Sequence, residues 1–220
     1  VHHIRMPTPT IGSDDGAVVI GYYAGQKMEG ATNSTIIGGG AAYKLTTGDH
    51  NTYIGSGCGP GTADSEASYN TAVGSTCGDS ITSSHSNILI GYGAATALTT
   101  GIRNISIGRD SQSTNTEGPD NVVVGYAACP AGGYNVAVGN NALGNNVASN
   151  NTAVGHSAGK VSNGGTQNTF IGRYAGYALT TGDYSCIVGG NAGESITTGT
   201  HNTLLGWHAG DNITTGDSNI

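Results

Sequence analysis

The side chains best suited to recognition chemistry in this sequence are large aromatic and arginine residues that follow a recurring glycine. Tyrosine and tryptophan present flat apolar faces that can stack on sugar rings, while their polar edges reach water. The residue type at these positions varies between repeats while the neighbouring positions stay the same, so we expect the side chains to form a solvent-facing column. One interpretation of this column is a shallow ladder that binds a surface glycan. The alternative is that they fill an edge or pack between chains. The column comprises Tyr22, Tyr92, Arg109, Tyr126, Arg173, Tyr174 and Trp207.

The sequence gives no comparable signal for catalysis or metal binding. Serine, histidine and aspartate are abundant, yet none occupies a unique break in the repeat where a nucleophile would meet a base. Asp49, Asp183 and Asp217 each follow a T-T-G segment. The G-G-x-G-x-D-x-U-x pattern of calcium-binding β-rolls is absent, so we interpret them as solvated turn residues. We therefore predict no enzymatic activity, no catalytic residues, no metal site and no cofactor.

The four cysteines, at positions 58, 77, 129 and 186, lack the C-x-x-C spacing of metal sites. Cys58 and Cys77 occupy a slot of the repeat that usually holds alanine. One interpretation is a small buried apolar side chain at each position. The other is a disulfide between adjacent repeats, because stacked equivalent positions lie about 5 Å apart.

The composition excludes several classes of protein. The 220 residues include 39 glycines, one Phe and one Trp, and only 10% of them are charged, so the chain cannot build a thick aromatic core. The formal net charge is −7 and the basic residues are scattered, which argues against nucleic-acid binding through phosphates. No apolar run reaches the roughly 18 residues that a membrane-spanning helix needs, so we predict no membrane insertion in this segment.

The dominant feature of the chain is an internal repeat. A glycine preceded by Ile, Val or Leu recurs twelve times, mostly at a spacing of 17 residues, and asparagine stands four residues before it in nine units. The glycines are Gly21, Gly38, Gly55, Gly74, Gly91, Gly108, Gly125, Gly139, Gly155, Gly172, Gly189 and Gly206, and the asparagines are Asn51, Asn70, Asn87, Asn104, Asn121, Asn135, Asn151, Asn168 and Asn202.

Each slot of the unit N-T-x-[I/V]-G-x-x-A-G-x-x-L-T-T-G-x-x has a physical interpretation. The Thr and Ile/Val slots lie two residues apart and share one face of a short strand, which we expect to contribute to the core. The glycine permits a turn, and the alanine slot indicates close backbone packing. A second apolar slot predicts another short strand before the T-T-G turn. The unit is thus expected to hold two short strands and two turns.

Stacked units predict an all-β fold, a parallel β-solenoid or β-roll of about twelve 17-residue repeats. We assign residues 17–220 to this repeat shaft, which is expected to continue beyond the C-terminal end of the segment, and residues 1–16 to an N-terminal connector or cap. The apolar slots make only a thin core, whose burial barely offsets the entropy of ordering the chain. We therefore expect a homotrimer, with a monomeric solenoid as the alternative.

The pattern N-T-x-[I/V]-G-x-x-A-G, seen at residues 151–159, 168–176 and 202–210, resembles repeats of known fibrous proteins. It is similar to repeats in phage tail-fibre and structural proteins, those of cyanophages especially, and in related bacterial surface proteins. It is also similar to the YadA-like β-roll in the heads of trimeric autotransporter adhesins. The 17-residue unit with its T-T-G turn fits the phage type better, because the adhesin repeats are shorter.

The resemblance implies a homotrimeric parallel β-roll in an extracellular fibre that attaches to a host or surface. On this basis we expect a virion structural protein, a phage tail fibre, with the head of a bacterial trimeric adhesin as the alternative. The implied location is extracellular, on a virion or on a bacterial cell surface. The implied partners are further copies of the chain and a host-surface glycan or protein receptor.

An ice-binding β-solenoid is an alternative of a different class. Paired threonines would stack about 4.8 Å apart, as ice-binding solenoids arrange them. The ladder is interrupted between Gly101 and Lys160, which would spoil a flat face. The pairs are Thr46 and Thr47, Thr99 and Thr100, Thr180 and Thr181, Thr197 and Thr198, and Thr214 and Thr215.

Overall fold

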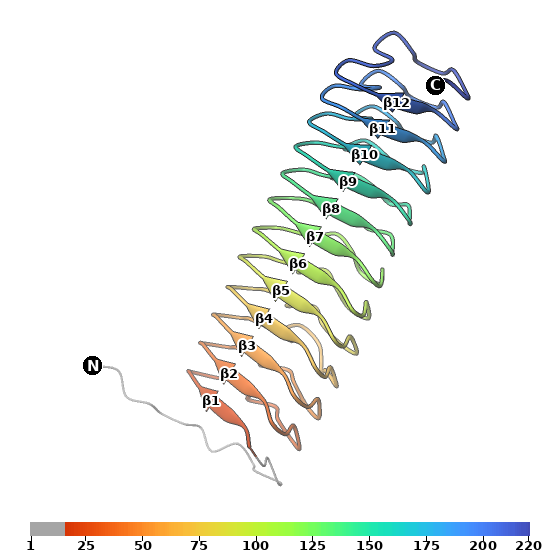
Figure 1. Ribbon diagram of the computed structural model, residues 1–220. Coiled ribbons are helices and arrows are strands. Elements are labelled where there is room, and N and C mark those ends of the chain that lie inside the picture. The colour runs from red at the N-terminus through yellow and green to blue at the C-terminus, as the bar shows by residue number, and fades with distance from the viewer. Residues whose placement is uncertain (1–15) are drawn as a thin grey trace. The chain divides into compact units, whose positions relative to one another are not determined.

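The computed structural model describes residues 16–220, so the expected N-terminal connector of residues 1–16 lies outside the described residues except for Gly16. The chain divides into two compact units, unit 1 up to Glu117 and unit 2 from Gly118 onward. Each unit is a parallel β-solenoid in which successive turns of chain stack on one another, as the repeat predicts (Figure 1). Across residues 16–220 there is no helix that is long and apolar enough to cross a membrane.

Each turn of the solenoid, here called a rung, contributes one strand of three residues. The pairs within each unit are parallel, and their register aligns equivalent residues, such as Tyr53 with Ala72. Unit 1 holds β1 (Val18–Ile20), β2 (Thr35–Ile37), β3 (Thr52–Ile54), β4 (Thr71–Val73), β5 (Ile88–Ile90) and β6 (Ile105–Ile107) in sequence order. Unit 2 holds β7 (Val122–Val124), β8 (Val136–Val138), β9 (Thr152–Val154), β10 (Thr169–Ile171), β11 (Cys186–Val188) and β12 (Thr203–Leu205).

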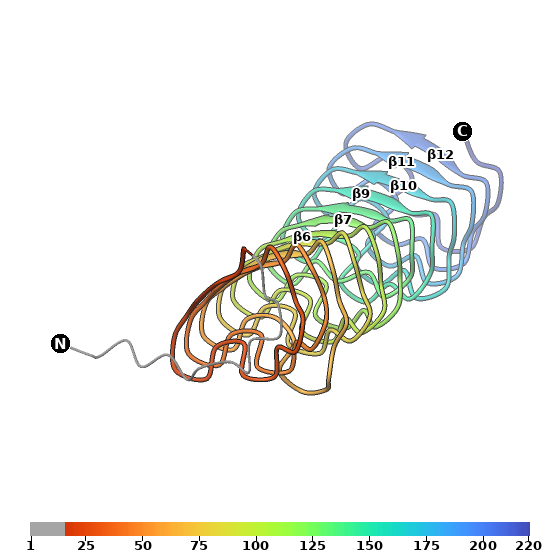
Figure 2. The same cartoon turned by 90° about the horizontal axis from the view of Figure 1, so that it is seen from below.

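The second strand predicted for each unit does not form. Opposite the strand, the chain within residues 16–220 makes only isolated bridges, Leu45 with Ser65 and Ser68 with His85. The backbone on this side still forms hydrogen bonds to the next rung, but two successive N–H groups donate to the same carbonyl oxygen. Thr180 and Thr181 both donate to the Thr197 oxygen, at 2.7 and 3.4 Å. A parallel ladder needs evenly spaced, separate partners, so this side is a stack of turns that closes each rung into a loop (Figure 2).

The strands bury the opposite face from the one expected. The first and third residues of each strand do share a face, but that face points outward, and the middle residue is buried in β2 to β12. In β10, Phe170 is fully buried while Ile171 is exposed. The middle slot ranges from Ala72 to Phe170 because a core position must only match the local volume. Because the residue type varies so much at this middle position, the position does not stand out as part of the sequence repeat.

The core of each unit is built from three columns of side chains, namely the middle strand residues, the alanine slot and the second apolar slot. In one rung these are Phe170, Ala175 and Leu179, all fully buried. The largest buried residue of unit 1, Tyr53, donates its hydroxyl to Asn51 Oδ1 at 3.2 Å. Burial raises the pKa of the Tyr53 phenol far above its usual range.

Cys58 and Cys77 occupy the alanine slot as small buried residues, which confirms the first of the two interpretations. Both are free thiols, and each donates a hydrogen bond of 3.2 Å to a backbone carbonyl, that of Ala72 and of Leu89 respectively. No disulfide links these two rungs. A thiol therefore serves here as a slightly larger alanine with a weak donor that is satisfied.

The repeat asparagines form a buried ladder between rungs. Asn151 Oδ1 accepts from the Asn168 backbone N–H at 2.9 Å, and Asn151 Nδ2 donates to the Gly165 carbonyl at 2.8 Å. Equivalent bonds to the following rung's N–H recur along each unit, with a serine hydroxyl in two rungs. A buried carboxamide needs partners for both of its ends, and this position supplies them in almost every rung.

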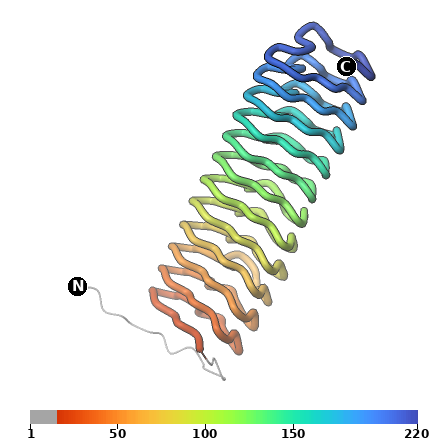
Figure 3. The backbone as a smooth tube through the Cα atoms, viewed as in Figure 1, coloured from red at the N-terminus to blue at the C-terminus, as the bar shows by residue number. Residues whose placement is uncertain are grey.

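The repeat glycines reflect the close approach of adjacent rungs. A Cβ added to Gly172 would lie 2.5 Å from the carbonyl oxygen of Gly189, and Gly172 has a φ of +129°. Both the contact and the backbone angle exclude a side chain. The same relationship holds between Gly21 and Gly38 and onward, which produces the regular stack of turns visible in each unit (Figure 3).

Candidate functional site

The first and third strand residues form an uncharged surface on each unit, which we call the outer face. Its third position is Ile, Val or Leu in every rung, and its first is Val, Ile, Thr or Cys. In unit 1 the outer face comprises Val18, Ile20, Thr35, Ile37, Thr52, Ile54, Thr71, Val73, Ile88, Ile90, Ile105 and Ile107. In unit 2 it comprises Val122, Val124, Val136, Val138, Thr152, Val154, Thr169, Ile171, Cys186, Val188, Thr203 and Leu205.

The outer face exposes apolar side chains that a folded monomer usually hides. Val18 is 48% exposed, Ile90 38% and Ile171 41%. Soluble monomers rarely present contiguous apolar patches of this kind, and such patches mark interaction sites. The rows repeat at the spacing of parallel strands, about 4.8 Å, so a partner must match that period. Sequence reasoning missed this surface because it placed the same residues in the core.

The predicted aromatic and arginine column lies along the turn that follows each strand. Tyr22 and Trp207 are its most exposed aromatic members, at 70% and 79%. Two cation–π pairs order parts of the column. The Arg109 guanidinium lies 5.7 Å from the Tyr92 ring centroid, and that of Arg173 lies 4.5 Å from the Tyr174 centroid.

The column is not one continuous ladder. Between Tyr22 and Tyr92, the equivalent residues of the intervening rungs are Gly39, Ser56 and Ser75, which offer no ring faces. The flat surfaces therefore occur in separate groups. Of the predicted set, the structure pairs Tyr92 with Arg109 and Arg173 with Tyr174, whereas Tyr22 contacts Tyr23, with ring centroids 4.0 Å apart. Tyr126 is 47% exposed and belongs to the first rung of unit 2.

A second exposed aromatic column, which sequence reasoning missed, lies just before the asparagine ladder. His50 stacks on Tyr69 with ring centroids 5.0 Å apart, and Tyr184 stacks on His201 at 5.1 Å. These residues have positive φ, for example 60° at Tyr69. The available signal was positional, since the residue before each repeat asparagine is never apolar aliphatic.

We expected the aspartates after the T-T-G segments to be solvated turn residues, but they have a structural role. Asp49 Oδ1 accepts from both the backbone N–H and the hydroxyl of Thr32, at 2.6 and 2.9 Å. Asp183 binds Thr166 in the same way, and Asp217 binds Thr200. Each carboxylate thus ties its own rung to the preceding one.

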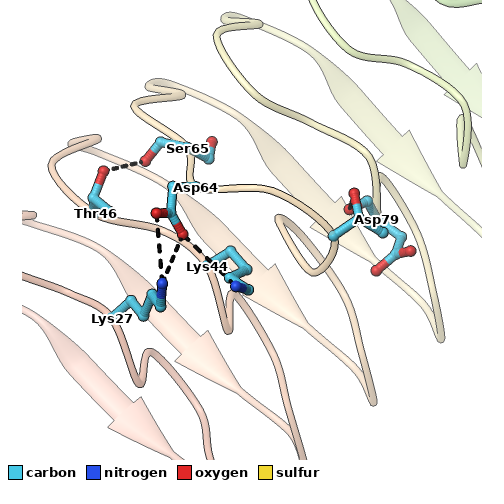
Figure 4. Close-up of polar contacts among 7 residues, drawn as sticks. Lys27, Lys44, Thr46, Asp64, Ser65 and Asp79 are labelled. Atoms are coloured by element: carbon cyan, nitrogen blue, oxygen red, sulfur yellow. Dashed lines mark hydrogen bonds and ion pairs between the residues drawn. The ribbon is translucent and has the colours of Figure 1, made fainter.

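The longer rung between β3 and β4 carries a charged cluster (Figure 4). Asp64 Oδ1 lies 3.0 Å from Lys27 Nζ and 3.8 Å from Lys44 Nζ, so one carboxylate bridges lysines of two other rungs. The hydrogen bond from Lys27 holds the pKa of Asp64 below its usual range and raises the pKa of Lys27. All three groups are at the surface, where solvent weakens the interaction.

No group of three or more metal-binding side chains occurs among residues 16–220. Comparisons with protein-family models, with curated proteins and with solved structures found no match.

Proposed function

We propose that this chain is the structural shaft of an extracellular homotrimeric fibre of the phage tail-fibre type, which mediates attachment to a host surface. The observation that carries the proposal is the outer face. It is uncharged at every position, its third position is Ile, Val or Leu in every rung, and its first position is β-branched in every rung except that of β11, where it is Cys186.

A second copy of the same chain is the partner that fits this face best. Another copy presents identical rows at an identical period, so apolar rows meet apolar rows at every rung when the chains run parallel. Parallel chains related by rotation about a common axis keep equivalent rungs at one height. A compact globular partner would have to match a repeat of about 4.8 Å along the face, which few surfaces do.

The resemblance of the N-T-x-[I/V]-G-x-x-A-G units to phage fibre repeats supports three chains and an attachment role. A solenoid rung is also suited to a shaft, because each rung bonds mainly to its neighbours and adds length without changing the interior. The exposed tyrosines and arginines would then serve as contact points for a surface glycan or receptor.

The ice-binding alternative receives little support from the threonine pairs. In four of the five pairs the first threonine already uses its hydroxyl, as where Thr46 Oγ1 donates to the Ser65 carbonyl at 2.8 Å and Thr180 Oγ1 donates to the Thr197 carbonyl at 2.8 Å. In these four pairs only the second threonine, as at Thr47 and Thr181, is exposed. An absence of thermal hysteresis in the purified protein is the expected result, and measurable hysteresis would favour the ice-binding function.

Native mass spectrometry and light scattering of the purified chain test the proposal. The expected mass is that of three chains. The variant Ile90→Lys with Ile171→Lys places one charge on each unit's outer face and should shift the protein to monomer. The matched control, Thr100→Lys with Thr181→Lys, places the same charges on exposed turns of the same rungs and should stay trimeric.

Cys186 provides an independent reporter, because it is the first residue of β11 and is exposed on the outer face of unit 2. Its reaction with a thiol reagent should be slow in the wild-type trimer and fast in the dissociated lysine variant. A monomeric wild-type chain with a rapidly reacting Cys186 would rule out the proposed fibre.

A further inference from the structure

Unit 2 gathers basic and aromatic side chains on two adjacent rungs, those of β9 and β10. Tyr174 and Tyr177 meet edge to face, with ring centroids 5.3 Å apart and planes at 87°. Arg173 lies over the Tyr174 ring at 4.5 Å, and Lys160 lies 5.9 Å from the centroid of Tyr177. His156 also meets Tyr174 edge to face, with ring centroids 5.3 Å apart.

The solenoid holds this group in place. His156 and Arg173 take the same slot in consecutive rungs, and so do Lys160 and Tyr177. The backbone N–H of Tyr174 donates to the His156 carbonyl at 3.0 Å, which joins the two rungs at the cluster. Tyr174 and Tyr177 are half-buried, so their rings are fixed, whereas Arg173 and His156 are exposed.

The cations of this cluster have no carboxylate partner. Within residues 16–220, neither Lys160 nor Arg173 lies in an ion pair. The nearby Glu194, which follows Tyr177 in the same slot, accepts a hydrogen bond from Asn191 instead. On a chain with a formal net charge of −7, two cations that lie on adjacent rungs outside any ion pair form a local positive site.

Unit 1 contains a similar set of side chains, in which the lysines contact a carboxylate of the chain itself. There Tyr23 and Tyr43 also meet edge to face, at 6.2 Å and 88°, and Lys44 lies 5.6 Å from the Tyr43 centroid. In that cluster the Asp64 carboxylate reaches both Lys27 and Lys44, so it offsets one of the two positive charges (Figure 4). The chain therefore supplies an internal carboxylate in unit 1 and none in unit 2.

We infer that the unit 2 cluster binds a carboxylate-bearing saccharide, an inference that rests on the proposed attachment function and names its ligand class. The carboxylate would contact Arg173 and Lys160, where guanidinium and ammonium groups make charge-assisted hydrogen bonds. The apolar face of the sugar ring would pack in the right-angled corner of Tyr174 and Tyr177. A neutral sugar would use only the second of these contacts.

Isothermal titration calorimetry with trigalacturonate tests the site on the intact chain. The uronate should bind, and its methyl ester, which keeps the ring faces but removes the charge, should bind at least tenfold more weakly. Arg173→Gln and Lys160→Gln should each weaken uronate binding at least tenfold. The matched control Lys44→Gln removes a cation that also lies over a tyrosine, Tyr43, but already pairs with Asp64, and it should leave binding unchanged.

Three results would overturn the assignment. These are no uronate binding to wild-type chain, equal binding of the ester, and equal binding to Arg173→Gln. A glutamate peptide that binds as tightly as the uronate would show a general anion site and would also refute a saccharide site. The mass of the same samples separates the two proposals. A trimer that ignores uronate refutes only this site, whereas a monomer that binds uronate refutes only the trimeric fibre.

Discussion

Gly176 packs so closely against Phe170 that a Cβ added to the glycine would lie 2.3 Å from a ring carbon. The same ring is 2.5 Å from the position of a Cβ on Gly159, so two glycines of adjacent rungs make room for the one phenylalanine of the chain. Because the glycines leave space that the large ring fills, the middle position of the strand can hold residues of very different size without disturbing the stack of rungs.

Gly176→Ala should therefore destabilise the protein by about 2–4 kcal/mol, since it combines overpacking with a left-handed φ of 59°. Urea denaturation followed by circular dichroism measures the effect. Phe170→Leu in the Gly176→Ala background should recover part of the loss. Gly164→Ala is the control, because its nearest neighbour would be 3.6 Å away. Equal costs for the two alanine variants would contradict the packing account.

Asn168→Ala should cost about 2–4 kcal/mol of unfolding free energy, because it leaves two buried backbone groups without partners. These are the Ser185 N–H, which Oδ1 accepts from at 2.9 Å, and the Gly182 carbonyl, to which Nδ2 donates at 2.8 Å. The control is Gln167→Asn, an exposed neighbour whose φ of 58° asparagine tolerates. If Asn168→Ala lowers the unfolding free energy no more than Gln167→Asn does, the asparagine ladder is dispensable for stability.

Ser162→Ala should stabilise the protein by about 1 kcal/mol. The Ser162 hydroxyl is fully buried in the second apolar slot of its rung and has no hydrogen-bond partner, so its removal relieves a desolvation cost. Ser195→Ala, at an exposed position, should change stability by less than about 0.5 kcal/mol. Thermal and urea unfolding of both variants provide the comparison, and a destabilised Ser162→Ala would refute the assignment.

Asp79→Asn should raise stability at neutral pH and have little effect in acid. Burial raises the pKa of Asp79, so the folded protein disfavours its carboxylate relative to the unfolded chain. The destabilisation is present above the raised folded pKa and disappears as pH falls below the ordinary carboxyl pKa of about 3.9. Unfolding curves of wild type and variant should therefore converge on acidification. Curves that diverge in acid would contradict the direction of the shift.

The sequence predicted the glycine, asparagine and alanine slots correctly because each slot answers a backbone requirement that recurs in every rung. Gly172 must admit the Gly189 carbonyl, and Asn151 must join two rungs. Such requirements fix the residue type itself. A repeat of residue types was therefore enough to predict a parallel solenoid.

The same pattern misled us about the strand faces and the second strand. Alternation shows that Thr169 and Ile171 share a face, but not which face is buried, and the varied middle slot hid Phe170. The second apolar slot, as at Leu179, suggested a strand, yet its neighbours share carbonyls as turns do. The pair of Lys27 with Asp64 joins residues 37 apart through an inserted loop, which no spacing rule predicts.

The glycine contacts also determine how such a chain can change in evolution. Because a repeat glycine inside each unit accommodates the carbonyl of the repeat glycine one rung away, a duplicated rung meets the same surface above and below it as the original did. The length of the solenoid then depends on the number of rungs, and recombination within the gene can add or remove a whole rung. Extra residues inside a rung have to be extruded at a corner, as the loop that carries Asp64 illustrates.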